Sequence, residues 1–339
     1  LPLLEKQPSN LFFIRPRRFG KSIFLSMLRT YYDIAQKEKF EKRFSNLWIG
    51  SRPTQLQGTF QILFLDFSRV GGLDRTLAEN FDDYCCGGLD DFASIYEPYY
   101  YPGFEEEMKA QYGTTNKLNF LDRKARNNGS KLYLIVDEYD NFTNVVLNEQ
   151  GDKVYHALTH ASGFYREIFK KFKGMFERIF MTGVSPVTLD DLTSGFNIGW
   201  NISTDHQFNM MLGFSETDVR EMIQYYKDAG QLPGNTNIDA MIEEMRPWYD
   251  NYCFAEESLE RDPKMFNCDM VFYYLRHYMT LGKSPKEMID PNTRTDYNKM
   301  KKLIRLDKLD GNRKGVLRKI TEDGQIVTTL TTTFPATDI

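Results

Sequence analysis

The sequence contains little cysteine and little histidine, with four residues of each among 339. The cysteine spacing matches neither a zinc site nor a disulfide framework; the four are Cys85, Cys86, Cys253 and Cys268. No uncharged apolar run reaches the roughly 18 to 20 residues that a membrane-spanning helix needs, and the first residues carry no signal-peptide pattern. These absences argue against a zinc-binding, disulfide-rich or membrane protein, so we expect a soluble, cytoplasmic one.

The sequence also lacks a strong excess of charge of one sign. It has 43 Lys and Arg residues against 47 Asp and Glu, a net charge of −4 and a pI near 5.8. A surface that binds nucleic acid over its whole extent is therefore not expected, although this charge balance does not exclude a local basic groove. Apolar residues make up 41% and charged residues 27%, the balance of a globular protein with one large or two ordinary domains. The chain begins at Leu1 without a methionine, so we expect a segment to precede it.

What the sequence does contain is a phosphate-binding loop between a strand and a helix. Residues 15–22 read Arg-Pro-Arg-Arg-Phe-Gly-Lys-Ser and follow the apolar run 11–14. Gly20 lets the backbone approach a phosphate, and Lys21 places an ammonium near the β- and γ-phosphates. Ser22 supplies a hydroxyl for Mg²⁺ at the start of a helix. The first glycine of the usual G-x-x-x-x-G-K-[ST] pattern is missing, because Arg15 stands in its place.

The other loop residues are assigned to the same nucleotide site. Arg17, Arg18 and Phe19 precede Gly20 directly and are predicted to bind the cofactor together with Gly20, Lys21 and Ser22. For the two arginines, phosphate contact and a solvated or salt-bridged loop surface stay equally open, because an exposed guanidinium needs no special geometry.

A second strand ends in two acids, Asp137 and Glu138, after the apolar residues 132–136. A Mg²⁺-dependent nucleotide hydrolase needs such a pair beside its phosphate loop: Asp137 is predicted to hold the metal, and Glu138 to orient and polarise the attacking water. Alone, an apolar run that ends in two acids is a weak signal. It becomes strong here because both halves of one site occur in order on separate strands.

A third strand, residues 178–185, ends in hydroxyl side chains. In nucleoside triphosphatases with an extra strand between the loop and the acidic strand, a polar residue at this point often senses the γ-phosphate. Thr182 is assigned to that position, with Ser185 as the alternative.

The remaining pattern predicts a parallel sheet followed by helices. Further strands are expected at 62–67 and 208–214, and a helix at 21–35 that buries Ile23. Residues 73–127 are expected to be mainly helical, with breaks at Gly87-Gly88, Pro98, Pro102-Gly103 and 113–115. After residue 210 the chain reads as helices separated by prolines, at 215–229, 238–245, 268–280 and 296–306, with a threonine-rich strand at 324–333. The expected domains are an ATPase domain, residues 1–210, and a mainly helical domain, residues 211–339.

These motifs resemble those of a bacterial AAA-ATPase-like family whose members carry an R-P-R-R-F-G-K-S loop. The resemblance rests first on residues 13–22, 134–140 and 180–184. It covers most of residues 10–280. In that family an arginine at the position of Arg15 is normal.

Later signposts support the same resemblance. Residues 213–215 are similar to the family's G-F-[ST] helix entry, and residues 248–254 to its Y-D-G-Y-x-F motif, with Asn251 in place of the glycine. At residues 265–269 the family commonly has Y-N-P, and this chain lacks the proline.

The resemblance implies an α/β fold, a P-loop NTPase of the additional-strand type related to AAA and to signal-transducing (STAND) ATPases. It implies ATP and Mg²⁺ as cofactors, and ATP over GTP, since no N-K-x-D motif is present. Many members carry a C-terminal nuclease domain of the PD-(D/E)XK type. That pattern is missing here, so the chain either ends before such a domain or never had one.

Three functions stay open from the sequence. The first is an ATP-hydrolysing module; the second is a slow or inactive nucleotide switch that fixes the helical domain. The third is an ATPase that serves DNA transactions, suggested by lysines and arginines between residues 299 and 319, although a charge run of this kind is usually a solvated helix face. The nucleotide is the main expected partner; DNA, a nuclease-type domain and a second copy of the chain are the others.

Overall fold

The computed structural model describes residues 1–70, 76–141, 164–184, 199–261 and 264–291. These fall into two compact units, which are taken one at a time: residues 1–212 with 254–261, and residues 213–253 with 264–291. The expected domains, 1–210 and 211–339, stay a prediction because residues 292–339 lie outside the described residues.

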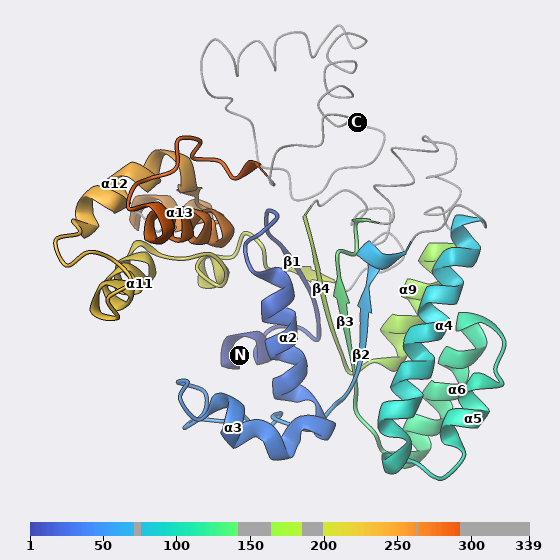
Figure 1. The fold of residues 1–339 in the computed structure, drawn as a ribbon. Helices are drawn as coiled ribbons and strands as arrows, with labels where there is room; N and C mark the ends of the chain where they lie inside the picture. The colour runs from blue at the N-terminus through green and yellow to red at the C-terminus, as the bar shows by residue number, and fades with distance from the viewer. Residues whose placement is uncertain (71–75, 142–163, 185–198, 262–263, 292–339) are drawn as a thin grey trace, which may run out of the picture. The chain divides into compact units, whose positions relative to one another are not determined.

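The first unit is built on a five-stranded sheet with the order β2-β3-β4-β1-β5. Every pair in it is parallel, and the strands are β1 (Asn10–Ile14), β2 (Gln61–Asp66), β3 (Leu132–Asp137), β4 (Arg178–Gly183) and β5 (Trp200–Asn201). β4 therefore lies between β1, which leads into the phosphate loop, and β3, which ends in the acids (Figure 1). This confirms the α/β fold of a P-loop NTPase with an additional strand.

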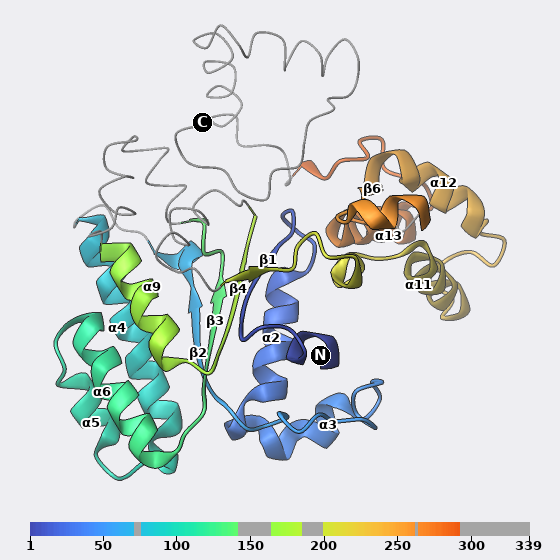
Figure 2. The ribbon, with the colours of Figure 1, turned by 180° about the vertical axis from the view of Figure 1, so that it is seen from behind.

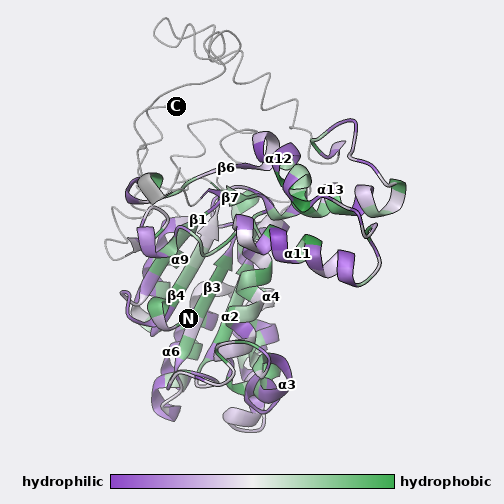
Figure 3. Ribbon diagram, turned by 90° about the vertical axis from the view of Figure 1, so that its left-hand side faces the viewer, coloured by the Kyte–Doolittle hydropathy of each residue, from purple (hydrophilic) through white to green (hydrophobic). Residues whose placement is uncertain are grey.

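Helices cover both faces of the sheet (Figures 1 and 2). On one side lie α2 (Lys21–Tyr32) and α3 (Phe40–Phe44), and on the other α4 (Leu77–Tyr96), α5 (Phe104–Lys109), α6 (Gly113–Asn128) and α9 (Phe164–Met175). Apolar residues line the strands between these layers (Figure 3). Burial on both faces explains why the strand sequences are continuous apolar runs.

Short elements complete this unit. They are α1 (Pro2–Glu5) and the 3₁₀ helices η1 (Ile34–Lys39), η2 (Phe67–Arg69), η3 (Glu97–Tyr99), η4 (His206–Phe208) and η5 (Glu256–Arg261).

Helix α4 runs unbroken through Gly87-Gly88, so the predicted break there is wrong. A β-carbon on Gly88 would lie 2.8 Å from Leu65 Cδ2 of β2. The glycine thus allows the helix to approach the edge strand closely rather than ending the helix. The hydroxyls of Tyr96 and Tyr84 then accept hydrogen bonds from the backbone N–H groups of Ile62 (2.9 Å) and Asp66 (2.7 Å) on that edge.

Two further sequence predictions are wrong. Residues 208–214 do not form the fifth strand of the sheet, which is β5 instead. The side-chain oxygen Oδ1 of Asn209 accepts hydrogen bonds from two backbone N–H groups of another segment, and Gly213 has φ 99°, which interrupts extended structure. Ile23 on α2 is 78% exposed, whereas Leu25 and Leu28 on the same helix are buried.

Among its described residues, 213–253 and 264–291, the second unit has three helices and one pair of short strands. The helices are α11 (Glu216–Asp228), α12 (Ile238–Tyr249) and α13 (Cys268–Leu281), and the antiparallel strands are β6 (Asp250–Tyr252) and β7 (Met265–Phe266). A capping box between Ser215 and Asp218 begins α11, as expected from the serine and acids there. The predicted helix 296–306 and strand 324–333 lie outside the described residues.

The Tyr96 hydroxyl provides a test of how the edge strand is held. It accepts from Ile62 N–H and donates to Asp33 Oδ1 at 2.9 Å. Tyr96→Phe leaves both groups without this partner, so we expect unfolding free energy to fall by about 1–3 kcal/mol in denaturant titration. Tyr112→Phe is the control because Tyr112 is 91% exposed. Equal stabilities of the two variants would contradict the role of the Tyr96 hydroxyl.

Candidate functional site

The phosphate loop joins β1 to α2 and contains two residues with left-handed backbone. Gly20, the N-cap of α2, has φ 89°, and Arg18 has φ 68°. A β-carbon on Gly20 would meet no atom within 4 Å, so the backbone conformation rather than crowding favours glycine there. No side chain caps the N-terminus of α2. Its first N–H groups therefore form a site for an anion, strengthened by the helix dipole.

Lys21 folds over the loop that precedes it. Its Nζ donates to the backbone oxygens of Arg15 (3.0 Å) and Pro16 (2.9 Å), and the side chain is 6% exposed. An ammonium has three donors, and the described residues provide acceptors for two of them. Burial lowers the pKa of Lys21, while the nearby charges of Glu138 and Asp137 oppose that shift.

A hydrogen bond connects the loop with the acidic strand: Ser22 Oγ donates to Asp137 Oδ2 at 2.7 Å. Ser22 lies in α2, which follows β1, and Asp137 is the last residue of β3. β1 and β3 are separated in the sheet by β4. Because the strands are parallel, their carboxyl ends meet at one edge. The structure thus brings together the two residues predicted to hold the metal.

Glu138 and Asp140 place further negative charge beside Asp137. Glu138 has the left-handed φ of 48°, and its backbone N–H donates to Asp137 Oδ1 at 2.9 Å. Asp140 is 2% exposed, and both of its oxygens accept from Val184 N–H at 3.2 Å. This bond fixes the chain after β3 to the chain after β4.

Burial and the nearby negative charges raise the pKa values of two of these acids, Asp137 and Glu138. Burial raises the pKa of Asp137, and the charge of Asp66 adds to that effect although the Ser22 hydrogen bond opposes it. Burial and the neighbouring Asp137 likewise raise the pKa of Glu138, with Lys21 opposing the shift. A carboxylate with a raised pKa is a better proton acceptor, which suits a general base.

Thr182 is buried at the end of β4, 1% exposed, and no described residue is hydrogen-bonded to its Oγ1. Its backbone oxygen accepts from Tyr139 N–H at 3.1 Å, so it lies beside the acidic strand, and it pairs with Phe13 of β1 on the other side. A buried hydroxyl without a partner is unusual and is typical of sites that bind a further group. Ser185, the alternative, lies outside the described residues.

The three remaining loop residues, Arg17, Arg18 and Phe19, differ in how far they are exposed to solvent. Arg17 and Arg18 are exposed, and the charge of Arg17 acts on both Lys21 and Glu138. Phe19 is 0% exposed, with its ring 5.5 Å from that of Phe254. Its ring belongs to the core, so the Phe19 side chain is not on the surface of the loop.

Sequence reasoning missed Asp140 and Gly183. A β-carbon on Gly183 would lie 2.4 Å from Asp140 Oδ1 and 2.7 Å from the Tyr139 ring. Gly183 therefore makes room for Asp140 to reach Val184. The only sequence signal was a third acid, two residues beyond the predicted pair.

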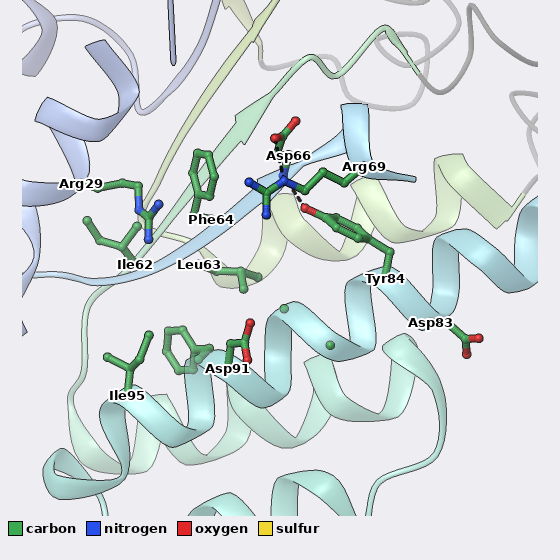
Figure 4. A pocket seen from close by; sticks show the side chains of 13 residues that line it. Arg29, Ile62, Leu63, Phe64, Asp66, Arg69, Asp83, Tyr84, Asp91 and Ile95 are labelled. Atoms are coloured by element: carbon green, nitrogen blue, oxygen red, sulfur yellow. Dashed lines mark hydrogen bonds and ion pairs between the residues drawn. The ribbon is translucent and has the colours of Figure 1, made fainter. Parts of the chain in front are cut away.

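A separate cavity of about 470 Å³ lies between β2 and α4 (Figure 4). Arg29 and Phe64 line one part of it, and Tyr84 and the ion pair of Asp66 with Arg69 (3.2 Å) line another. None of the predicted site residues lines this cavity. The candidate site at the loop and the strand ends is therefore separate from this cavity.

The fold, the loop and the acidic strand together define a P-loop nucleoside triphosphatase-type module. Residues 1–193 match the family model described as Predicted AAA-ATPase, which is more than half of the chain. The chain belongs to this predicted AAA-ATPase family, which confirms the resemblance.

One protein with a similar sequence and one solved structure were compared with this chain. An uncharacterized protein in the vnfD 5′ region of Azotobacter chroococcum mcd 1 is 27% identical over 263 residues, which is 76% of this chain and 44% of that protein. The chain thus spans less than half the length of that relative. The Aeropyrum pernix ORC1 protein, solved in complex with DNA, matches 95% of this chain and 69% of its own, with 12% identity and a TM-score of 0.36. A likeness at this level carries no argument about function.

Among the described residues, no helix combines the length and the apolar character needed to cross a membrane. The cytoplasmic location stays a prediction.

The raised pKa of Glu138 predicts a pH-dependent change in stability. A folded-state pKa above the ordinary 4.5 means that the folded state loses stability as pH rises through the raised pKa. Glu138→Gln removes this loss. We expect it to raise the unfolding temperature at about pH 8 and to have no such effect below the ordinary pKa. Glu41→Gln on the surface of α3 is the control. A stabilisation of equal size at both pH values would contradict this electrostatic origin.

The orphaned hydroxyl of Thr182 predicts that removing it stabilises the nucleotide-free protein. Thr182→Val should raise the free energy of unfolding by about 1 kcal/mol, because the buried hydroxyl is lost without breaking a hydrogen bond. Thr114 is equally buried, but its Oγ1 donates to Asp82 O at 3.0 Å. Thr114→Val should therefore destabilise the protein in the same measurement. Destabilisation by both variants would show that the Thr182 hydroxyl is satisfied.

Proposed function

We propose that the module binds ATP with Mg²⁺ and hydrolyses it. The observation that carries the proposal is the 2.7 Å hydrogen bond from Ser22 Oγ to Asp137 Oδ2, which joins the two halves of the site from separate strands. A hydroxyl and a carboxylate that already face each other are oxygen donors of the kind Mg²⁺ prefers.

The residues around this bond fit the two cofactors. Magnesium in such sites uses one or two protein oxygens, with phosphate and water completing its coordination. Ser22 and Asp137 would hold the metal, and the uncapped N-terminus of α2 with Lys21 would hold the phosphates. The unpartnered Thr182 hydroxyl supports a further polar group at the end of β4. When bound, Mg²⁺ neutralises phosphate charge.

Each remaining side chain has a role in this proposal. Glu138 would accept a proton from the attacking water, a task supported by its raised pKa. Lys21 would neutralise charge on the β- and γ-phosphates, and Thr182 would sense the γ-phosphate. Arg17 and Arg18 are exposed on the loop, in keeping with phosphate contact or with a solvated surface.

The alternative within the same class is a nucleotide switch that turns over slowly or not at all. The pair of adjacent acids, Asp137 and Glu138, at the end of β3 favours hydrolysis over this alternative. For DNA-linked activity, the basic residues 299–319 lie outside the described residues, so no observation of the structure favours DNA or a nuclease-type partner.

Lys21→Ala and Glu138→Gln separate binding from turnover. Lys21→Ala should abolish ATP binding by removing the ammonium from the loop. Glu138→Gln should keep binding and lower the turnover number by about 10²–10⁴-fold, the usual contribution of a general base. Nucleotide titration and phosphate release measure the two effects. Glu177→Gln, which changes an exposed acid just before β4, is the control.

The results distinguish a hydrolase from a nucleotide switch and from a protein without this nucleotide site. Phosphate release at the wild-type rate from Glu138→Gln would overturn hydrolysis by this mechanism. Binding without turnover in the wild type would favour the switch, and an undiminished affinity of Lys21→Ala would overturn the nucleotide site itself.

A further inference from the structure

The side chain of Arg15 is buried in the protein. It is 1% exposed, and its guanidinium donates to three backbone oxygens: Ile14 (2.8 Å), Ser203 (2.8 Å) and Phe208 (2.7 Å). The backbone of Arg15 stays in the loop, since its N–H donates to Gly183 O at 3.3 Å and its oxygen accepts from Lys21. The residue in place of the first glycine thus connects the loop to the chain that follows β5.

Two aromatic rings enclose the same guanidinium. Its central carbon lies 4.1 Å from the centroid of Phe13 and 3.9 Å from that of Phe254. No described carboxylate forms an ion pair with it, and burial lowers its pKa to about 9, so it is still charged at neutral pH. The ring faces and the carbonyls replace the water that the cation loses on burial.

Phe254 contacts the loop a second time, through Phe19. These rings meet edge to face with their centroids 5.5 Å apart. One ring therefore packs against Arg15, where the loop begins, and against Phe19, the residue directly before Gly20. Both contacts lie within the first unit.

The position of Phe254 is fixed by hydrogen bonds. Asn209, 1% exposed, accepts from the backbone N–H groups of Phe254 (2.8 Å) and Ala255 (3.1 Å) through its Oδ1. It follows Phe208, whose oxygen accepts from Arg15. In the chain, Phe254 is the first residue of the segment that returns to this unit after residues 213–253 of the second unit.

We propose that Arg15 and Phe254 are positioning residues that hold the phosphate loop in its anion-binding conformation, so that nucleotide affinity depends on the segment returning from the second unit. This inference rests on the proposed nucleotide binding. A loop already held in the binding conformation avoids the free-energy cost of ordering itself when the ligand binds.

The sharpest consequence concerns the missing glycine. Arg15→Gly restores the usual motif, yet it removes three hydrogen bonds and the cation between two rings. We expect it to weaken binding of a fluorescent ATP analogue with Mg²⁺ by about tenfold or more, as expected when a preorganising contact is lost. Arg15→Lys should also weaken binding, because a single ammonium cannot reproduce the planar, multiply bonded guanidinium.

Phe254→Leu removes the aromatic ring but keeps a large apolar side chain in the loop's support. It should weaken binding by a similar factor. Because the two side chains share the contact between the guanidinium and the ring, the loss of binding free energy in the double variant Arg15→Lys with Phe254→Leu should be smaller than the sum of the two single losses.

Two controls distinguish positioning from general stability. Arg178, at the opposite end of β4, also donates to three backbone oxygens, those of Leu4, Glu5 and Gln7 (3.2–3.5 Å). Arg178→Lys should lower the unfolding temperature and leave affinity within about twofold, because it does not touch the loop. Leu259→Ala changes an exposed residue in the segment that begins at Phe254. It should leave the unfolding temperature and the nucleotide affinity unchanged.

All variants are made in the full chain, and the unfolding temperature of each is measured without nucleotide. Wild-type affinity in Arg15→Lys and Phe254→Leu, or an equal loss in Arg178→Lys, would overturn the inference even if Arg15→Gly failed to fold. Strictly additive effects in the double variant would also overturn it. A wild type that binds no nucleotide would overturn the proposed function and this inference with it.

Discussion

The hydrogen bond between Ser22 and Asp137 depends on the order of the parallel strands. The loop follows β1 and the acid ends β3, and β4 lies between them and ends at Thr182. Because parallel strands present their carboxyl ends at one edge, three polar side chains from distant parts of the sequence meet there. The rest of the first unit, its helices on both faces and its apolar strands, maintains this order.

The same arrangement makes the site electrostatically unfavourable without a ligand. Asp137, Glu138 and Asp140 are concentrated around Lys21, and burial raises the pKa of the first two. The hydroxyl of Thr182 is buried without a partner among the described residues. Such features reduce stability, and they are common where a protein binds a charged group. We interpret this loss of folding stability as a consequence of the proposed nucleotide site.

Prediction from sequence succeeded where the signal is local. Four continuous apolar runs became β1 to β4, since strands buried on both faces require such runs. It failed where packing decides. The two-residue strand β5 is too short to leave a pattern, and the apolar stretch 208–214 is diverted by Asn209, which binds another segment. Gly88 looked like a helix break, yet it serves close contact between α4 and Leu65.

The sequence by itself indicated the family and the α/β class, and it supplied the residues of the candidate site, because the phosphate loop and the acidic pair are each formed by consecutive residues. Only the tertiary structure decided what surrounds them. From the sequence, Arg15 was a departure from a motif; in the fold it is a buried cation between Phe13 and Phe254. The destination of a long side chain depends on segments far away in the chain, and no local pattern records those contacts.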